Sequence, residues 1–137
     1  MQKTGKLELT WVGKYDDKVV EPRILLEDVS NSYGDPSSDN MLIHGDNLIA
    51  LQALQQDYAG KIQCIYCDPP YNINAANGQY DDNIANSEWL SLMKQRLQLL
   101  DSLLTENGVI LVQIDKEQSA YLWMRYSLAV LILQLLL

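Results

Sequence analysis

The chain has 137 residues, of which 18 are acidic and 10 are basic, and its formal net charge is −8. A chain of this length fits one domain at most, and a domain of this size can bury about two-thirds of its unfolded surface. The acidic balance argues against an autonomous DNA-binding module, because surfaces that bind DNA are normally basic. The polar stretch Met1–Lys6 is not followed by the apolar core of a secretory signal, so we expect a cytoplasmic protein.

Residues 1–40 show no single pattern of apolar and polar residues. Residues 7–11 alternate weakly between apolar and polar side chains and could form an edge strand. Residues 31–40 are rich in Asn, Ser, Asp, Gly and Pro, which is typical of a loop. We therefore interpret residues 1–40 as an N-terminal extension and loop.

Two short apolar runs frame a predicted helix. Residues 41–43 form the first run, which is consistent with a strand. Asp46 is a plausible N-cap for a helix from Asn47 to about Tyr58, with its leucines on one face. Residues 62–67 form the second run and predict a buried strand.

A second strand–helix–strand pattern follows. Residues 72–86 are polar and predict a long loop. Ser87 can cap a helix that reaches Leu104, with an apolar stripe facing a sheet, and Asn107-Gly108 would end that helix. Residues 109–114 predict another buried strand. Strands that alternate with helices predict an α/β fold with a mostly parallel sheet.

Residues 119–137 are interpreted as a divergent apolar tail, which carries no charge after Arg125. Twelve uncharged residues are too few to span a bilayer, which needs about 20. Three interpretations stay open: the product of a truncated or frameshifted reading frame, a buried terminal helix, or a segment on a membrane surface. We expect no membrane partner.

Cys64 and Cys67 have C-x-x-C spacing. Such a pair can serve redox chemistry or bind zinc, but redox pairs sit at a helix N-terminus, whereas this pair lies in a predicted strand. A zinc site would need further ligands, and the chain has one His and no third Cys. We therefore expect buried apolar thiols in a reducing compartment and no metal site.

The tetrapeptide Asp68-Pro69-Pro70-Tyr71 directly follows the strand predicted for residues 62–67. Each proline fixes its own φ and lacks an N–H donor, so the strand must stop in a stiff turn. Ligands of open α/β sheets bind at the carboxyl ends of strands. A carboxylate, proline carbonyls and an aromatic ring at that place predict a site for an exocyclic amine on a planar base.

The chemistry of an aromatic amine explains this combination of groups. Its lone pair is delocalised into the ring, so the nitrogen is a poor nucleophile. Two acceptors, the Asp68 carboxylate and the Pro69 carbonyl, would favour the more pyramidal nitrogen that attacks an electrophile. Tyr71 can stack on the base, which must be flipped out of a duplex to reach such a pocket.

At these residues the chain resembles the amino-methylating DNA methyltransferases, whose catalytic motif looks like Asp68-Pro69-Pro70-Tyr71. Further blocks in the same order resemble the start of the modification subunit of type III restriction–modification systems. The resemblance covers about residues 5–118, and it rests on the blocks at residues 5–15, 22–28, 44–48, 80–83 and 89–93.

The resemblance implies a partial, truncated Rossmann-like methyltransferase fold, with residues 41–118 as part of the catalytic domain. It implies transfer of a methyl group from S-adenosylmethionine to the exocyclic amino group of adenine, although cytosine amino methylation stays open. Asp46 and Asn47 could contact the cofactor's adenine or ribose, or could only cap the helix. Double-stranded DNA, a restriction subunit and a second modification subunit are the partners implied for the complete enzyme.

The family's main cofactor loop has a glycine-rich pattern, yet neither G-x-G nor F-x-G-x-G occurs in this sequence. We therefore expect a fragment that is inactive alone. Two other interpretations stay open: a non-catalytic remnant of a broken gene, and a protein-interaction module that needs a second polypeptide.

Overall fold

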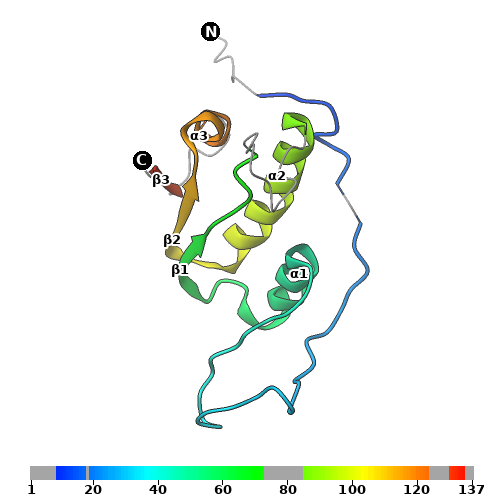
Figure 1. Ribbon diagram of the computed structural model, residues 1–137, viewed down its shortest axis with the longest axis vertical. Coiled ribbons are helices and arrows are strands. Elements are labelled where there is room, and N and C mark those ends of the chain that lie inside the picture. The colour runs from blue at the N-terminus through cyan, green and yellow to red at the C-terminus, as the bar shows by residue number, and fades with distance from the viewer. Residues whose placement is uncertain (1–8, 18, 73–84, 124–129, 135–137) are drawn as a thin grey trace, which may run out of the picture.

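The computed structural model describes residues 9–17, 19–72, 85–123 and 130–134. Three helices and three strands are found in these ranges (Figure 1). In chain order they are α1 (Asn47–Tyr58), β1 (Ile62–Cys67), α2 (Asn86–Leu103), β2 (Leu104–Ile114), α3 (Lys116–Trp123) and β3 (Val130–Gln134). None of the described helices is both long and apolar enough to cross a bilayer.

The sheet has the strand order β1-β2-β3, and both strand pairs are parallel. Cys64 to Cys67 pair in register with Val109 to Val112, and β3 pairs with the last five residues of β2. The predicted α/β class with a parallel sheet is confirmed, and the arrangement is a partial Rossmann-like fold. Its consequence for function is that β1 and β2 end at the same edge of the sheet.

The core lies between α2 and one face of the sheet. The buried stripe of α2 packs against the buried side chains of β2, and α1 packs beside α2 (Figure 1). Full burial of each large apolar side chain contributes about 1.5–3 kcal/mol. The fully buried residues of this core include Trp89, Met93, Leu97, Ile110, Val112 and Ile114.

The predicted bounds of α1 and β1 are confirmed, but the prediction that β1 is buried is wrong, because its residues are half-buried or exposed. The Asp46 carboxylate accepts hydrogen bonds from the backbone N–H groups of Leu48 (2.8 Å) and Ile49 (3.3 Å), so it caps α1 as expected. The strand predicted at residues 62–67 has the bounds of β1. These elements depend on local signals, a capping carboxylate and a short apolar run, which the sequence displays directly.

Both predicted ends of the helix before β2 are wrong. α2 begins at Asn86, and Ala85, at its N-cap, makes no capping hydrogen bond with its side chain, so Ser87 is not the cap. The helix ends at Leu103, because Leu104 is extended (φ −69°, ψ 146°) and pairs with Ile62. β2 therefore includes the residues that were expected to end the helix.

Gly108 has a different role from the helix stop that was predicted. A Cβ atom there would lie 2.8 Å from Leu104 Cδ2 and 3.0 Å from the Ile62 carbonyl oxygen. The register of β1 and β2 is irregular between Ile62 and Cys64, next to this contact. The close approach of the two strands therefore explains why position 108 is occupied by glycine, which has no Cβ atom.

Two further strand predictions fail. Residues 41–43 form no strand, and the Leu42 side chain is 99% exposed. Residues 9–11 are not a strand either, and residues 7–8 lie outside the described ranges. The loop expected at residues 31–40 is confirmed as exposed and irregular, whereas that expected at residues 72–86 falls largely outside the described ranges.

The prediction of buried thiols is wrong for Cys64, which is exposed, whereas Cys67 is half-buried, and both are free. Ile65 and Cys67 pack against the core, so the alternation of a strand turns Cys64 toward the opposite face. Burial raises the pKa of the Cys67 thiol, and the nearby Asp68 carboxylate raises it further. A thiol held neutral in this way is a poor nucleophile.

In the apolar tail, residues 130–134 form a strand, so the interpretation as a terminal helix is wrong for them. The strand pairs with β2, which places β2 in the centre of the sheet. The helix α3 that precedes it was not predicted. The remaining tail residues, 124–129 and 135–137, lie outside the described ranges.

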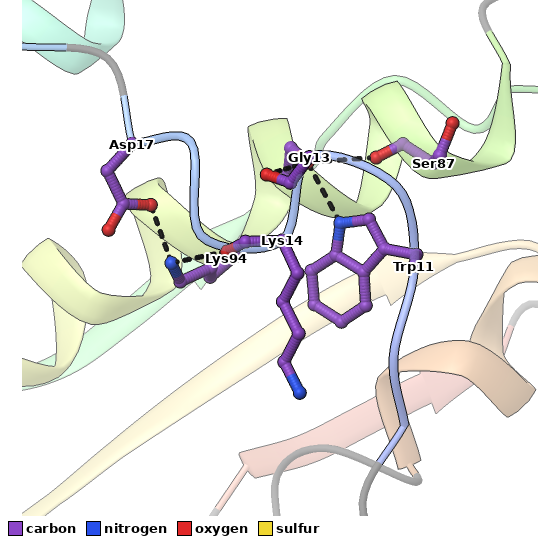
Figure 2. A network of polar contacts seen from close by, with 7 residues as sticks. Trp11, Gly13, Lys14, Asp17, Ser87 and Lys94 are labelled. Atoms are coloured by element: carbon purple, nitrogen blue, oxygen red, sulfur yellow. Dashed lines mark hydrogen bonds and ion pairs between the residues drawn. The ribbon is translucent and has the colours of Figure 1, made fainter.

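The segment of residues 11–17 lies against α2 through buried polar contacts (Figure 2). Trp11 Nε1 donates to Ser91 Oγ at 2.9 Å. Lys94 Nζ donates to the Lys14 carbonyl at 2.8 Å and pairs with Asp17 Oδ1 at 2.6 Å. Lys94 is only 6% exposed, so these two partners offset the cost of removing its ammonium group from water.

Lys94→Met should lower the free energy of unfolding by roughly 1.5–3 kcal/mol, the range for a hydrogen bond to a charged group. The methionine retains the apolar packing of the lysine stem, so the loss reports the polar contacts. Urea unfolding of the two proteins measures it. Arg23→Met is the matched control, because the Arg23–Glu21 pair is exposed and should contribute about 0–1 kcal/mol. Equal stability of Lys94→Met and the parent chain would contradict this account.

Candidate functional site

The turn Asp68-Pro69-Pro70-Tyr71 leaves β1 at the carboxyl end of the parallel sheet. Asp68 and Pro70 are exposed, Pro69 is buried and Tyr71 is half-buried. The structure therefore brings all four predicted residues to one edge, where open α/β sheets bind their ligands.

Trp89 of α2 holds the turn of residues 68–71 through a hydrogen bond. Its indole Nε1 donates a hydrogen bond of 2.8 Å to the Pro70 carbonyl, and its side chain is 0% exposed. The Pro70 carbonyl is thus already engaged. Among the described residues, no hydrogen bond to the Pro69 carbonyl is found, which leaves that oxygen and the Asp68 carboxylate as the acceptors of the turn.

Gln113 of β2 holds the tyrosine of the turn. Its Nε2 donates to the Tyr71 hydroxyl oxygen at 2.7 Å, and its Oε1 accepts a hydrogen bond from the Tyr66 hydroxyl. Burial raises the pKa of Tyr71; the hydrogen bond with Asp68 and its negative charge raise it further, whereas donation from Gln113 lowers it. Tyr71 is therefore a neutral phenol, and its hydroxyl oxygen accepts the hydrogen bond from Gln113.

A pocket of about 130 Å³ opens between the turn, α1 and α2. Asp68, Pro69 and Pro70 form one side of it, and Asn47 and Arg96 contribute polar groups. An apolar cavity of about 150 Å³ holds a benzene molecule, so this space suits about one aromatic ring. Its apolar wall is formed on α2 by Leu92, Met93, Leu97 and Leu100.

Arg96 links the pocket to the start of α1. Its Nε donates to Asn47 Oδ1 at 2.7 Å, and its Nη1 donates to the Leu92 carbonyl at 3.1 Å. Burial lowers the pKa of Arg96, while the negative charge of Asp46 acts in the opposite direction. Asn47 thus lies at the pocket, whereas Asp46 uses its carboxylate as the helix cap.

The sequence did not identify Trp89, Arg96 or Gln113 as site residues. Gln113 gave the clearest signal, because it is a polar residue inside the otherwise apolar run of residues 109–114. Arg96 similarly sits between apolar positions of α2. His44 is exposed, and Asp115 is half-buried directly after β2.

Comparison with known proteins gives a consistent result. Residues 62–135, more than half of the chain, match the family described as DNA methylase. The chain is 45% identical over 92 residues to the probable HindVI Mod subunit of a type III restriction–modification enzyme from Haemophilus influenzae, covering 67% of this chain and 12% of that protein.

Two further modification subunits are similar to the chain. The EcoPI Mod subunit of Escherichia phage P1 is 29% identical over 150 residues, covering 83% of this chain and 23% of that protein. The StyLTI Mod subunit of Salmonella typhimurium is 32% identical over 114 residues, covering 63% of this chain and 18% of that protein. The chain therefore spans less than a quarter of the length of each of these relatives.

Proposed function

The chain belongs to the DNA methylase family, and on that basis we propose that it supplies the catalytic turn of an adenine-specific DNA methyltransferase. The observation that carries the proposal is the acceptor pair at the end of β1. The Asp68 carboxylate and the Pro69 carbonyl remain as acceptors, while Trp89 engages the Pro70 carbonyl. Two acceptors match the two hydrogens of an exocyclic amino group.

The acceptor pair acts on the nucleophile. When both amino hydrogens are bound, the nitrogen becomes more pyramidal, and its lone pair is directed at the electrophile. Because the prolines and Trp89 fix the acceptors beforehand, the reaction needs little reorganisation of the protein. Asp68, as the acceptor of one amino hydrogen, would receive the amino proton as the nitrogen is methylated.

The residues of this chain that would hold S-adenosylmethionine are Asp46 and Asn47. Asn47 fits a polar ligand, because it lies at the pocket and its side-chain oxygen is already paired with Arg96, which leaves the amide N–H groups available as donors. The cofactor supplies an electrophilic methyl group when it is bound.

The target base enters from flipped-out DNA, since a base stacked in a duplex cannot reach this turn. Tyr71 does not line the pocket beside α1 and α2, but its half-buried ring follows the two acceptors in the turn and would supply a face for stacking. Stacking of a base on an aromatic side chain contributes about 1–3 kcal/mol.

The relatives are modification subunits of type III systems, and we place this chain in the same kind of assembly. Its partners would be double-stranded DNA, a restriction subunit and a second modification subunit. Because the net charge of the chain is −8, most contacts to DNA phosphates would come from other parts of that assembly.

Exchange into a relative tests this function. The chain replaces the matching segment of the HindVI Mod subunit, and the hybrid is incubated with methyl-labelled S-adenosylmethionine and mixed-sequence DNA. We expect label in the DNA, and we expect none with the 137-residue chain alone. The unmodified HindVI Mod subunit is the control. A folded hybrid that transfers no label, when the control does, would refute the proposed function.

A further inference from the structure

The backbone on both sides of Tyr71 is anchored to α2. The Pro70 carbonyl accepts a hydrogen bond from Trp89 Nε1 at 2.8 Å, and Asn72 Nδ2 donates to Asn86 Oδ1 at 3.0 Å. Asn72 has a φ of 51°, a left-handed conformation that asparagine adopts more readily than most residues. These contacts fix where the Tyr71 side chain leaves the backbone, but they leave its direction to other groups.

The Tyr71 side chain is contacted from the sheet face opposite α2. Val112 of β2 is 0% exposed in the core, so the alternation of the strand turns Gln113 to the other face. Cys67 packs toward the core, which places Tyr66 on the same outer face as Gln113. Because Cys67 is the last residue of β1 and pairs with Val112, Gln113 lies one position beyond the end of β1, beside the turn.

The Gln113 amide bridges two tyrosine hydroxyls on this face. Its Oε1 accepts from the Tyr66 hydroxyl, and its Nε2 donates to the Tyr71 hydroxyl oxygen at 2.7 Å. An amide offers an acceptor and donors side by side, and a phenol hydroxyl can serve as either, so both ends of the bridge are satisfied. The backbone of Tyr71 is thus anchored to α2 while its hydroxyl is anchored to β2, and the ring between them has a defined direction.

We propose that Gln113 is a positioning residue that holds the ring of Tyr71 in one orientation for stacking on the flipped base. Gln113 contacts no reacting atom in this arrangement and acts through Tyr71. A ring that is already held loses little rotamer freedom when the base arrives, so less of the stacking free energy is lost to ordering the side chain. The inference rests on the proposed function for its role in catalysis, whereas the orientation of the ring can be measured without any transfer of methyl groups.

The orientation is measured in the complete 137-residue chain, labelled with ¹³C and ¹⁵N. Three-bond couplings from Cγ at position 71 to its backbone nitrogen and carbonyl carbon report the side-chain rotamer. The parent chain should give the limiting values of one rotamer. Gln113→Met keeps the length of the side chain and removes both hydrogen bonds, so it should give averaged values. Gln63→Met, at an exposed position of β1, is the matched control and should keep the limiting values.

A double variant separates positioning from a general loss of packing. Tyr71→Phe removes only the hydroxyl and should also average the couplings at position 71. If Gln113 acts through that hydroxyl, Gln113→Met should change the couplings no further once Tyr71→Phe is present. Limiting values retained in Gln113→Met would overturn the proposal, as would an additive change in the double variant. If Gln113→Met fails to fold, limiting values retained in Tyr71→Phe overturn it alone.

The consequence for stacking is measured in the hybrid with the HindVI Mod subunit. Stacking acts on the bound base both before and during transfer, so Gln113→Met should raise KM for DNA and leave kcat unchanged. The expected rise is about 2- to 13-fold, the change in an equilibrium constant that one hydrogen bond represents. An unchanged KM, or a fall in kcat alone, would count against the proposal. A parent hybrid that transfers no label refutes the proposed function instead, and the couplings still decide whether Gln113 holds the ring.

Discussion

Replacing Asp68 by Ala is expected to lower methyl transfer by the hybrid enzyme about 100- to 1,000-fold, the effect of removing one preorganised hydrogen-bonding group, or about 2.7–4 kcal/mol. The carboxylate acts mainly on the nitrogen as it becomes pyramidal, so its loss falls on the chemical step. Initial rates with saturating S-adenosylmethionine measure the change.

The Asp68→Ala substitution should affect the rate constant of methyl transfer more than the affinity for DNA or cofactor. The rate constant of transfer should fall while much of the affinity for DNA and cofactor remains, because Asp68 contributes little to ground-state binding. Asp57→Ala is the matched control, since Asp57 is an exposed carboxylate on α1. Near-normal turnover of Asp68→Ala would require another group to be the principal acceptor.

Replacing Trp89 by Ala is expected to destabilise the chain by about 3–5 kcal/mol, the usual cost of removing a large aromatic side chain from a core. Trp89 is 0% exposed and belongs to the cluster between α2 and the sheet. The same substitution removes the donor to the Pro70 carbonyl. Urea unfolding followed by circular dichroism measures the loss.

Trp89→Phe separates the two contributions of this residue. Phenylalanine keeps an aromatic ring in the core but leaves the Pro70 carbonyl without its indole donor. Loss of one such hydrogen bond costs about 0.5–1.5 kcal/mol, so this variant should be intermediate in stability. If Trp89→Ala stayed within about 1 kcal/mol of the parent chain, the role of Trp89 in holding the turn would have to be abandoned.

The elements that could be predicted from the sequence depend on neighbouring residues. Asp46 caps α1 through the backbone of the next turn, and the two prolines end β1 without help from the rest of the chain. The α/β class follows from such local signals, as does the place of the turn directly after β1. The structure therefore agrees with the sequence where the physical cause is short-range.

The parts that could not be predicted depend on contacts between distant segments. Leu104 leaves the helical conformation because it pairs with Ile62, which lies 42 positions earlier in the sequence. The hydrogen bond from Gln113 to Tyr71 could not be predicted, because it depends on the sheet register that brings these two residues together. From the sequence, Arg96 would be predicted to be a solvated charge. In the structure its side chain donates a hydrogen bond to Asn47 of α1.

The central claim is that the turn after β1 receives the amino group of an adenine in DNA. The most direct test digests the DNA that the hybrid enzyme has labelled and identifies the methylated nucleoside by mass spectrometry. We expect labelled N6-methyldeoxyadenosine, and about 100- to 1,000-fold slower formation of it with the Asp68→Ala hybrid. Label found only in N4-methyldeoxycytidine or in a ring-methylated base would contradict the claim.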